Sequence, residues 1–198
     1  MARKAAYDRD EILRKARDLF WEKGFRNTSL KDLESTLDLR PGSIYAGFGS
    51  KQALFAAALE SYSTEGSIIL AGTFAKHSSP LEGLAAHVRG FSGLCEARAP
   101  SRACMLAKTI LEMPDDDPVL RPLAERLMAE VEHAFEAQFR AARDLGEIPR
   151  TSDPARLARH VQAGIIGLRA YAQRPVPAAV VRELAEDLAA GIEALRTE

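Results

Sequence analysis

The chain has 198 residues, of which 46% are hydrophobic, so it is long enough for one large domain or two small ones and can bury a substantial core. No apolar run approaches the roughly 18 residues that a membrane span needs, and residues 1–10 contain no apolar signal region, so we expect a cytoplasmic protein without a membrane partner. Two cysteines argue against a disulfide framework, and a net charge of −1 does not by itself indicate a nucleic acid.

The charge is unevenly distributed along the chain. Residues 1–52 contain 11 lysines and arginines against 8 aspartates and glutamates, whereas the remaining residues contain 16 against 20. A positive N-terminal part on a negative body suits a protein that meets a polyanion at one end. Because so small an asymmetry also arises by chance, other features must decide between the two interpretations.

The first predicted helix covers residues 8–23. Its apolar residues recur three and four positions apart, and Gly24 is a suitable C-terminal stop. The apolar stripe consists of Ile12, Leu13, Ala16, Leu19 and Phe20. Arg3 and Lys4 precede it on a short N-terminal arm.

A second, shorter helix follows, and a tight turn ends it. Thr28 or Ser29 can cap this helix, because a hydroxyl oxygen accepts an unpaired backbone N–H at a helix start. Three leucines give the helix one apolar face: Leu30, Leu33 and Leu37. Asp38 stands where the chain must reverse, and Asp tolerates left-handed backbone better than most residues.

The third helix begins at Pro41, which suits a first helical turn because its missing N–H is no loss there. Ile44 and Phe48, four positions apart, point this helix back at the second one. Lys51 opens the helix that follows. Two short helices locked around a turn by a few apolar contacts indicate helix-turn-helix DNA binding.

Six further helices are predicted after this motif. They cover about 51 to beyond 67, 81–97, 101–111, 118–145, 155–172 and a last segment after Pro177 that contains Val181 and Leu195. Ser50, Ser101 and Asp153 are the expected N-caps, and prolines or glycines separate the segments. Since no strand pattern and no internal repeat is present, the sequence predicts an all-α protein of about nine helices.

The N-terminal pattern resembles the DNA-binding domain of the TetR family of bacterial transcriptional regulators. The resemblance covers about a quarter of the chain and rests on Ile12-Leu13, Ala16, Leu19-Phe20, Lys23-Gly24-Phe25, Thr28-Ser29, Asp32-Leu33, Gly42-Ser43-Ile44-Tyr45, Phe48, Ser50-Lys51 and Leu54. It implies that residues 1–50 form a three-helix helix-turn-helix DNA-binding domain. Residues 51–198 would then form a larger helical domain for effector binding and dimerisation.

The resemblance also implies which residues contact double-stranded operator DNA. Thr28, Tyr45 and Lys51 would contact phosphates, and the N-terminal arm would touch the DNA backbone. Our own candidate for base reading is Arg40, where many TetR-like sequences have a small polar residue, because a guanidinium can grip guanine O6 and N7 together. The other base-reading positions are Pro41, Gly42, Ser43 and Ala46. The alternative for Tyr45 is an ordinary core aromatic.

Several residues depart from the family pattern. Asp38 replaces the usual turn glycine, Glu34 replaces a small residue, and the recognition helix has few polar side chains. Base readout therefore relies partly on apolar contact or DNA shape, and the operator sequence is left open.

The last two predicted helices are expected to form a dimer interface. The segment 155–172 is apolar on nearly every side, and Gly164 and Gly167 would allow close backbone approach. We interpret the pair as half of a four-helix interface in a homodimer, which is also where TetR-like proteins dimerise. The expected interface residues are Val161, Ile165, Leu168, Leu184, Leu188 and Ile192. The alternative is that the pair completes the core of a monomer.

The family resemblance implies an effector pocket among the middle helices. The candidate lining residues are Phe91, Cys104, Lys108, Leu111, Phe135, Phe139, Gln162 and Tyr171. Because few charged residues are expected to point inward, a small hydrophobic or mildly polar effector, as yet unknown, is favoured. Most of these residues are equally compatible with an ordinary core.

Cys104 raises a separate possibility, a reactive sensor cysteine. The segment around it resembles a Gly-Cys-Leu type segment of one branch of the family, in which some members sense electrophiles or oxidants. Lys108 or Arg102 could favour its thiolate. Ala103 and Met105 replace the usual Gly and Leu, and the alternative is a small buried hydrophobe.

No metal, cofactor or enzymatic activity is expected. The four histidines show no metal-ligand spacing: His77, His87, His133 and His160. No Gly-x-Ser-x-Gly, Walker or His-Glu-x-x-His motif is present. The resemblance to the TetR family implies a ligand-responsive repressor that binds a palindromic operator as a dimer and is released by a small hydrophobic or electrophilic effector. The alternatives are an all-helical enzyme and a DNA-binding dimer without an effector, which release of bound DNA by a small molecule or thiol reagent would distinguish.

Overall fold

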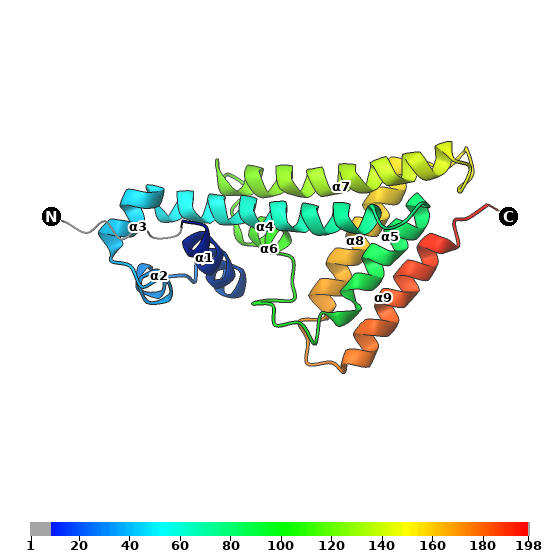
Figure 1. Ribbon diagram of the computed structural model, residues 1–198. Helices are drawn as coiled ribbons and strands as arrows, with labels where there is room; N and C mark the ends of the chain where they lie inside the picture. The colour runs from blue at the N-terminus through cyan, green and yellow to red at the C-terminus, as the bar shows by residue number, and fades with distance from the viewer. Residues whose placement is uncertain (1–8, 198) are drawn as a thin grey trace.

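Residues 9–197 are described by the computed structural model. They form nine α-helices and one short 3-10 helix, with no strand in this range (Figure 1), which confirms the predicted all-α class. Arg3 and Lys4 of the predicted arm lie outside the described residues. The helices are α1 Arg9–Lys23, α2 Leu30–Leu37, α3 Pro41–Phe48, α4 Lys51–Phe74, α5 Pro80–Arg89, the 3-10 helix η1 Gly90–Gly93, α6 Met105–Glu112, α7 Leu120–Asp144, α8 Pro154–Tyr171 and α9 Ala178–Glu193.

Two long helices, α4 and α7, run side by side along the molecule (Figure 1). Helices α1, α2 and α3, which we call the head, gather at the N-terminal end of α4. Helices α5, α8 and α9 lie at the opposite end, and α6 packs against α4 and α7 between the two groups. We call α5 to α9 the body, and α4 joins it to the head.

The head is shaped by helix caps that are local in sequence. Ser29 caps α2, since its hydroxyl accepts the Asp32 N–H at 3.1 Å while the Asp32 carboxylate accepts the Ser29 N–H at 2.8 Å. Hydrogen bonds from Lys23 and Ser29 hold the pKa of the Asp32 carboxyl group far below its ordinary value. Asp38 ends α2 in the left-handed region at φ 52°, so the turn keeps its shape without the usual glycine.

The apolar core of the head continues into the body without a break. Phe20, Leu33 and Ile44 are buried together with Phe55 of α4, and the Phe20 and Phe55 rings meet edge to face at 4.8 Å. The same cluster includes residues of α6 and the first half of α7: Met105, Leu106, Leu120, Ala124 and Leu127. The head therefore packs on α6 and α7 as well as on its own helices.

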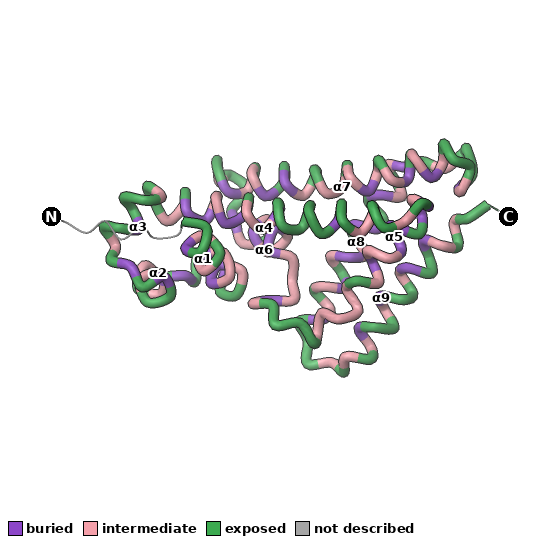
Figure 2. The backbone as a smooth tube through the Cα atoms, in the orientation of Figure 1, coloured by how far each residue is buried: buried purple, intermediate pink, exposed green. Residues whose placement is uncertain are grey.

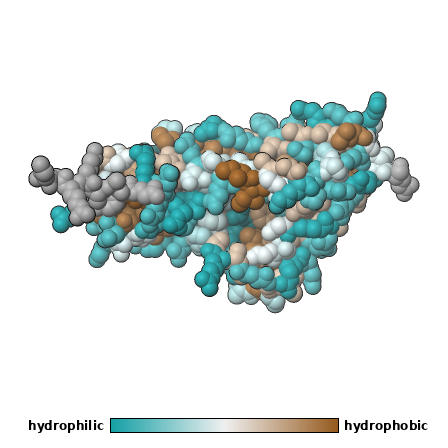
Figure 3. All heavy atoms as spheres, in the orientation of Figure 1, coloured by the Kyte–Doolittle hydropathy of each residue, from teal (hydrophilic) through white to brown (hydrophobic). Residues whose placement is uncertain are grey.

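Two further clusters form the core of the body, between α5, α7, α8 and α9. The second half of α4 contributes little to them: residues 64–69 are exposed, and this stretch is mostly green in Figure 2. Ile68 and Ile69 of this stretch are large exposed hydrophobic residues, and Figure 3 shows a brown patch over α4 with a hollow in the surface below it.

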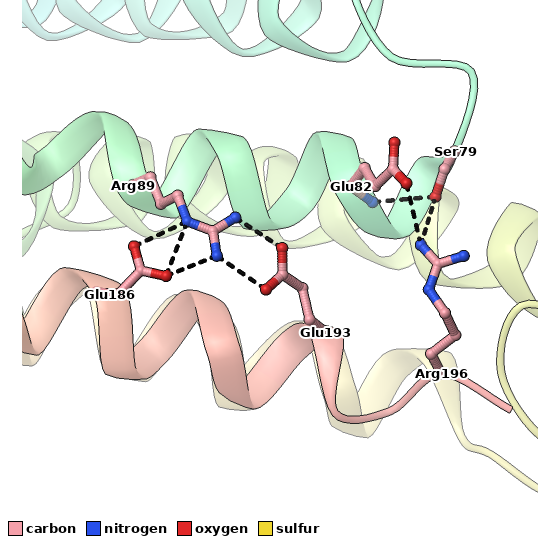
Figure 4. Close-up of polar contacts among 6 residues, drawn as sticks. All are labelled: Ser79, Glu82, Arg89, Glu186, Glu193 and Arg196. Carbon is pink, nitrogen blue, oxygen red and sulfur yellow. Dashed lines mark hydrogen bonds and ion pairs between the residues drawn. The ribbon is translucent and has the colours of Figure 1, made fainter. Parts of the chain in front are cut away.

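Ion pairs on the surface fasten α9 to α5 (Figure 4). Arg89 of α5 pairs with Glu186 and Glu193 of α9, both at 2.7 Å, and Arg196 reaches Ser79 and Glu82 at the start of α5. The hydrogen bonds from Arg89 lower the pKa of the Glu186 and Glu193 carboxyl groups. Because these groups are largely exposed, their contribution to stability is small, and they mainly fix the orientation of the two helices.

The predicted helices 81–97 and 101–111 are shorter in the structure. The first ends at Arg89 and continues only as η1, whose first and last residues are glycines, which disfavour an α-helical course. The second starts at Met105 instead of after Ser101, because other side chains hold the intervening backbone. Gln173 accepts the N–H groups of Arg102 and Ala103, and Arg169 donates to their carbonyl oxygens.

Candidate DNA-binding and regulatory sites

Helix α3 presents most of the predicted base-reading residues on one exposed side. Ile44 is fully buried and fastens α3 to the head, which turns the opposite side outward. The exposed side carries Arg40, Gly42, Ser43 and Ala46, with Pro41 half-buried at the first turn. The C-terminal end of α3 is fastened by Arg9, whose guanidinium lies 4.9 Å from the centre of the Phe48 ring.

Arg40, the expected guanine reader, lies in an acidic setting. It shares a shallow concavity between α2 and α3 with Glu34 and Asp38, two of the residues that depart from the family pattern. Two carboxylates beside the recognition helix repel a phosphate backbone, and they attract the guanidinium in the absence of DNA. Glu34 and Asp38, which differ from the family pattern, thus lie next to Arg40, the predicted base-reading residue.

The three predicted phosphate contacts lie in different settings. The Tyr45 side chain is 41% exposed, so it is not a core aromatic. The Lys51 ammonium lies 4.4 Å from the centre of the Phe25 ring, and burial lowers its pKa against the opposing effect of Glu112 and Asp32. The structure does not expose Thr28 as the prediction requires: this residue is fully buried, and its hydroxyl donates to the Gly24 carbonyl oxygen at 2.6 Å.

The predicted effector residues do not form one group. Phe135 and Phe139 are buried in the body, and Gln162 donates to the Met128 carbonyl oxygen at 2.8 Å. Phe91 is half-buried near α8, and Tyr171 is half-buried beneath Arg174.

For Leu111 and Lys108, the structure contradicts the prediction that they line an effector pocket inside the body. Leu111 is 87% exposed, because α6 turns this position to solvent, so it lines no interior pocket. Lys108 points toward α1, where its ammonium donates to the Trp21 carbonyl oxygen at 2.6 Å, and burial lowers its pKa.

The sequence reasoning missed His87, which lies at the centre of an aromatic group in the body. Its ring lies 5.2 Å from Phe91, 5.7 Å from Phe135 and 6.3 Å from Phe74, measured between ring centres. Burial, assisted by the positive charge of Arg169, lowers the pKa of His87 to about 4. The only sequence signal was the spacing of four between His87 and Phe91, which is equally common in ordinary helices.

Cys104 lies at the start of α6 beside Tyr62 of α4. Burial raises the pKa of Tyr62, with Cys104 acting in the same direction and Arg169 against it. Neither expected cationic neighbour of Cys104 is free to approach, since Lys108 is bonded to α1 and Arg102 to the Ala172 carbonyl. Cys95 packs in a different cluster of the body.

The segment 101–104 connects the head to α8. Trp21 of α1 donates its indole N–H to the Ala103 carbonyl oxygen at 2.7 Å, and Arg169 of α8 donates to the same oxygen at 3.3 Å. The Arg169 guanidinium also lies 5.9 Å from the centre of the Trp21 ring. A displacement of the 101–104 segment would therefore change its contacts with both α1 and α8.

Helices α8 and α9 contact each other, and one face of α8 is not covered by any other helix of residues 9–197. Of the predicted interface residues, Val161, Ile165, Leu168 and Ile192 are buried within the single chain, whereas Leu184 and Leu188 are half-buried. The free face of α8 carries small residues instead: Ala163, Gly167 and Ala170 are exposed. Beside them, a groove of about 540 Å³ between the two helices is lined by apolar side chains including Val161, Leu188 and Leu195 and by His160 and Asp187.

The two glycines of α8 have different surroundings. A Cβ atom at Gly164 would lie 2.9 Å from Leu188 Cδ2, so this glycine allows α8 and α9 of one chain to approach. A Cβ atom at Gly167 would meet no atom within 4 Å. Gly164 is therefore needed for the packing of α8 on α9 within one chain, and only Gly167 lies on the free face of α8.

Residues 9–197 contain neither a cluster of metal ligands nor a membrane-spanning helix. Within that range no group of three His, Cys, Asp or Glu residues is arranged to hold a metal ion. No helix in the same range has the length and apolar character to cross a membrane.

The fold and the exposed recognition helix define a class, helical transcriptional regulators with an N-terminal helix-turn-helix. Residues 12–58 match the family model for bacterial regulatory proteins of the tetR family, and residues 80–194 match that for a tetracyclin repressor-like C-terminal domain. The chain belongs to the TetR family of transcriptional regulators.

Two curated relatives are similar over most of their length. An uncharacterized HTH-type transcriptional regulator, YezE of Bacillus subtilis, is 31% identical over 179 residues, which cover 85% of this chain and 87% of YezE. The HTH-type transcriptional repressor ComR of Escherichia coli is 28% identical over 173 residues, covering 84% of this chain and 80% of ComR.

Solved structures of the family superpose over almost the whole chain. A cysteine mutant of the TetR family regulator CifR in complex with a 26-bp operator duplex is 26% identical, with a TM-score of 0.87 over 96% of this chain and 98% of CifR. A TetR family regulator from Cytophaga hutchinsonii shares the fold, with a TM-score of 0.85 at 21% identity over 100% of this chain and 99% of its own.

Proposed function

We propose that this regulator is a repressor that binds a palindromic operator as a homodimer and releases it when a small hydrophobic or electrophilic effector binds the body. The observation that carries the proposal is the exposed face of α3, with Arg40, Ser43 and Tyr45 turned outward by the buried Ile44. An operator-bound relative, CifR, and a relative named as a repressor, ComR, support the same function.

In this proposal the DNA-binding part of the chain and the regulatory part meet near residue 50. Residues 1–50 bind the DNA, and residues 51–198 bind the effector and the second copy. The free face of α8 and the apolar groove beside it support docking of a second copy, because an exposed apolar groove flanked by small residues suits the close packing of helices. The proposed effector residues of the body are Phe91, Phe135, Phe139, Gln162 and Tyr171, to which we add His87 because its ring lies near those of Phe91 and Phe135. Cys104 is a separate proposed site for an electrophile.

The experiment that tests the proposal is fluorescence anisotropy of the purified protein with duplexes from the region upstream of its own gene, over a salt series. Salt-sensitive binding to one site, with weak binding to the other duplexes, is the expected result. Uniform weak binding to all duplexes would contradict a role in recognising an upstream operator. An effector-independent DNA-binding dimer would bind selectively but would not be released by any small molecule or thiol reagent.

Arg40→Ala is expected to weaken operator binding by about 1–3 kcal/mol, because a bidentate contact to guanine is lost. Discrimination at one base pair of each half-site should be lost with it. Tyr45→Phe removes a hydroxyl that would contact a phosphate, so it should weaken binding to all sequences alike. Anisotropy titrations on the operator and on its single-base variants measure both effects.

Arg98→Ala is the matched control for Arg40→Ala, since Arg98 is also exposed but lies between η1 and α6. This variant should bind like the parent protein. Equal losses for Arg98→Ala and Arg40→Ala would mean that only net charge matters and that α3 reads no base.

Treatment with N-ethylmaleimide is expected to release the operator by alkylating Cys104. Because Tyr62 lies beside the thiol, we expect the added group to displace the 101–104 segment and its bonds to Trp21 and Arg169. We expect a loss of affinity of at least about tenfold, or 1.4 kcal/mol, in the parent protein and in Cys95→Ser.

Cys104→Ser should keep its affinity after the same treatment. Cys95→Ser is the matched control, because both cysteines are free and half-buried. A Cys104→Ser protein that is still released by the reagent would rule out Cys104 as the sensor.

A further inference from the structure

Helix α1 is completed at its C-terminal end by two side chains of α6. An unbroken α1 would bond the Phe25 N–H to the Trp21 carbonyl oxygen and the Arg26 N–H to the Glu22 carbonyl oxygen. Gly24 turns the chain away at φ +84°, and neither bond is made.

Lys108 and Glu112 replace those two bonds. Lys108 Nζ lies 2.6 Å from the Trp21 carbonyl oxygen and 3.1 Å from that of Glu22. The Glu112 carboxylate accepts the Phe25 N–H at 3.0 Å and the Arg26 N–H at 2.5 Å. Being four positions apart, the two side chains share one face of α6, so a single surface of the body satisfies both the orphan carbonyl oxygens and the orphan N–H groups.

The remaining carbonyl oxygens at this end of α1 are satisfied from within the head. The Lys23 oxygen accepts from Asn27, and the Gly24 oxygen accepts from Thr28. Lys108 and Glu112 are thus the body's contribution to the corner between α1 and α2. A Cβ atom at residue 24 would lie 2.7 Å from Glu112 Oε2, so this contact also requires glycine at that position.

We propose that Lys108 and Glu112 are positioning residues for DNA binding, which fix the orientation of the head on the body and thereby the spacing of the two recognition helices in the dimer. This rests on the proposed function. The apolar contacts between head and body are non-directional and allow some rotation, whereas charge-assisted hydrogen bonds on both sides of one corner define an angle. A displacement of α6 would pass directly to α1 through the same bonds.

The test is the dependence of affinity on the spacing of the two half-sites. Each base pair added between them moves one half-site by about 3.4 Å and rotates it by about 34°. The parent protein should therefore lose affinity steeply on duplexes with one or two base pairs added to the operator.

Lys108→Met and Glu112→Gln keep the shape of each side chain. The first removes both hydrogen bonds of the ammonium, and the second replaces one acceptor oxygen by an NH2 group, so that at most one of the two bonds to the Phe25 and Arg26 N–H groups remains. The affinity of both variants for the native spacing should fall by about tenfold, while the further loss on the longer duplexes shrinks to less than about threefold. Lys108→Arg, which keeps a long cation, should restore the dependence of the parent protein. The matched controls are Glu136→Gln and Arg140→Met, which break an i,i+4 ion pair at the far end of α7 and should behave like the parent.

A second measurement tests the contacts of Lys108 and Glu112 with the end of α1 in the absence of DNA. Hydrogen exchange of the Phe25 and Arg26 amides should be slow in the parent, and at least one of the two should exchange fast in Glu112→Gln, while the Ser29-capped start of α2 is unchanged. Emission of Trp21, the only tryptophan of the chain, should shift in Lys108→Met because its carbonyl oxygen loses that partner.

The outcomes separate the two proposals. If the parent protein binds no duplex selectively, the proposed function fails and the role in DNA binding falls with it. If the parent binds selectively but the variants keep its affinity and its dependence on spacing, only the role of Lys108 and Glu112 is refuted. Variants that merely unfold in part would show a smaller active fraction with the parent's dependence on spacing, which also refutes it.

Discussion

Gly167→Arg is expected to abolish tight operator binding by separating the two copies of the chain while each copy stays folded. Gly167 is exposed on α8 and has no atom within 4 Å of the position of a Cβ, so a single chain accommodates the side chain. A second copy packed on this face would meet a charged side chain where a glycine allowed close contact. Arginine also has a higher helix propensity than glycine, so α8 itself should not be weakened.

The expected loss of affinity for a palindromic operator is about 10²–10⁴-fold, because a monomer loses the effective concentration that links the two half-sites. Analytical ultracentrifugation gives the mass in solution, and anisotropy gives the affinity for the operator and for a single half-site. Binding to the half-site should be unchanged by the substitution.

Gly72→Arg is the matched control, since Gly72 is an exposed helical glycine on α4 that also has no neighbour within 4 Å of a Cβ. It should stay dimeric. A Gly167→Arg protein that remains a dimer with full affinity would exclude the free face of α8 from the interface.

Lowering the pH from 7 to 4 is expected to remove about 3 kcal/mol of unfolding free energy through His87 alone. The ordinary pKa of histidine is 6.5, and in the folded protein burial lowers that of His87 to about 4. Between these two values the unfolded state binds a proton and the folded state does not, so stability falls as the pH falls. Each unit of difference corresponds to about 1.4 kcal/mol, and below pH 4 His87 adds no further loss.

Urea unfolding of the parent and of His87→Gln at several pH values between 7 and 4 measures this effect. Carboxyl groups with lowered pKa values, such as those of Glu186 and Glu193, also lose stabilisation as the pH falls. The difference between the two proteins therefore isolates His87. His133→Gln, a change at an exposed histidine of α7, should follow the parent curve. Parallel curves for the parent and His87→Gln would show that His87 is protonated equally in both states.

The ends of most helices could be predicted because the signals lie within a few residues of the bonds they make. Ser50 accepts the Ala53 N–H, and Asp153 accepts those of Ala155 and Arg156, as expected from their positions alone. The prediction that Ser101 caps a helix was wrong, because the deciding contacts come from residues far away in the sequence. Gln173 and Arg169, about 70 residues away in sequence, hold the backbone after Ser101 in a non-helical course.

The recognition helix could also be anticipated, because one buried residue determines its orientation. Once Ile44 points inward, helical geometry turns Ser43 and Ala46 outward, whereas Arg40 is the extended N-cap residue that precedes the helix. Thr28 and Ser29, in contrast, are adjacent residues of similar chemistry. Packing against the rest of the head decides that one is buried and the other caps α2.

By itself the sequence determined the all-α class, the family and the exposed side of α3, because periodicity, caps and the local motif express these within short segments. Tertiary structure alone decided the roles of Lys108, Glu112, His87 and the two glycines of α8. Each role depends on partners from another helix, brought together by burial of the apolar faces. Apolar burial is non-directional, so the sequence pattern shows which residues are inside but not which of them meet.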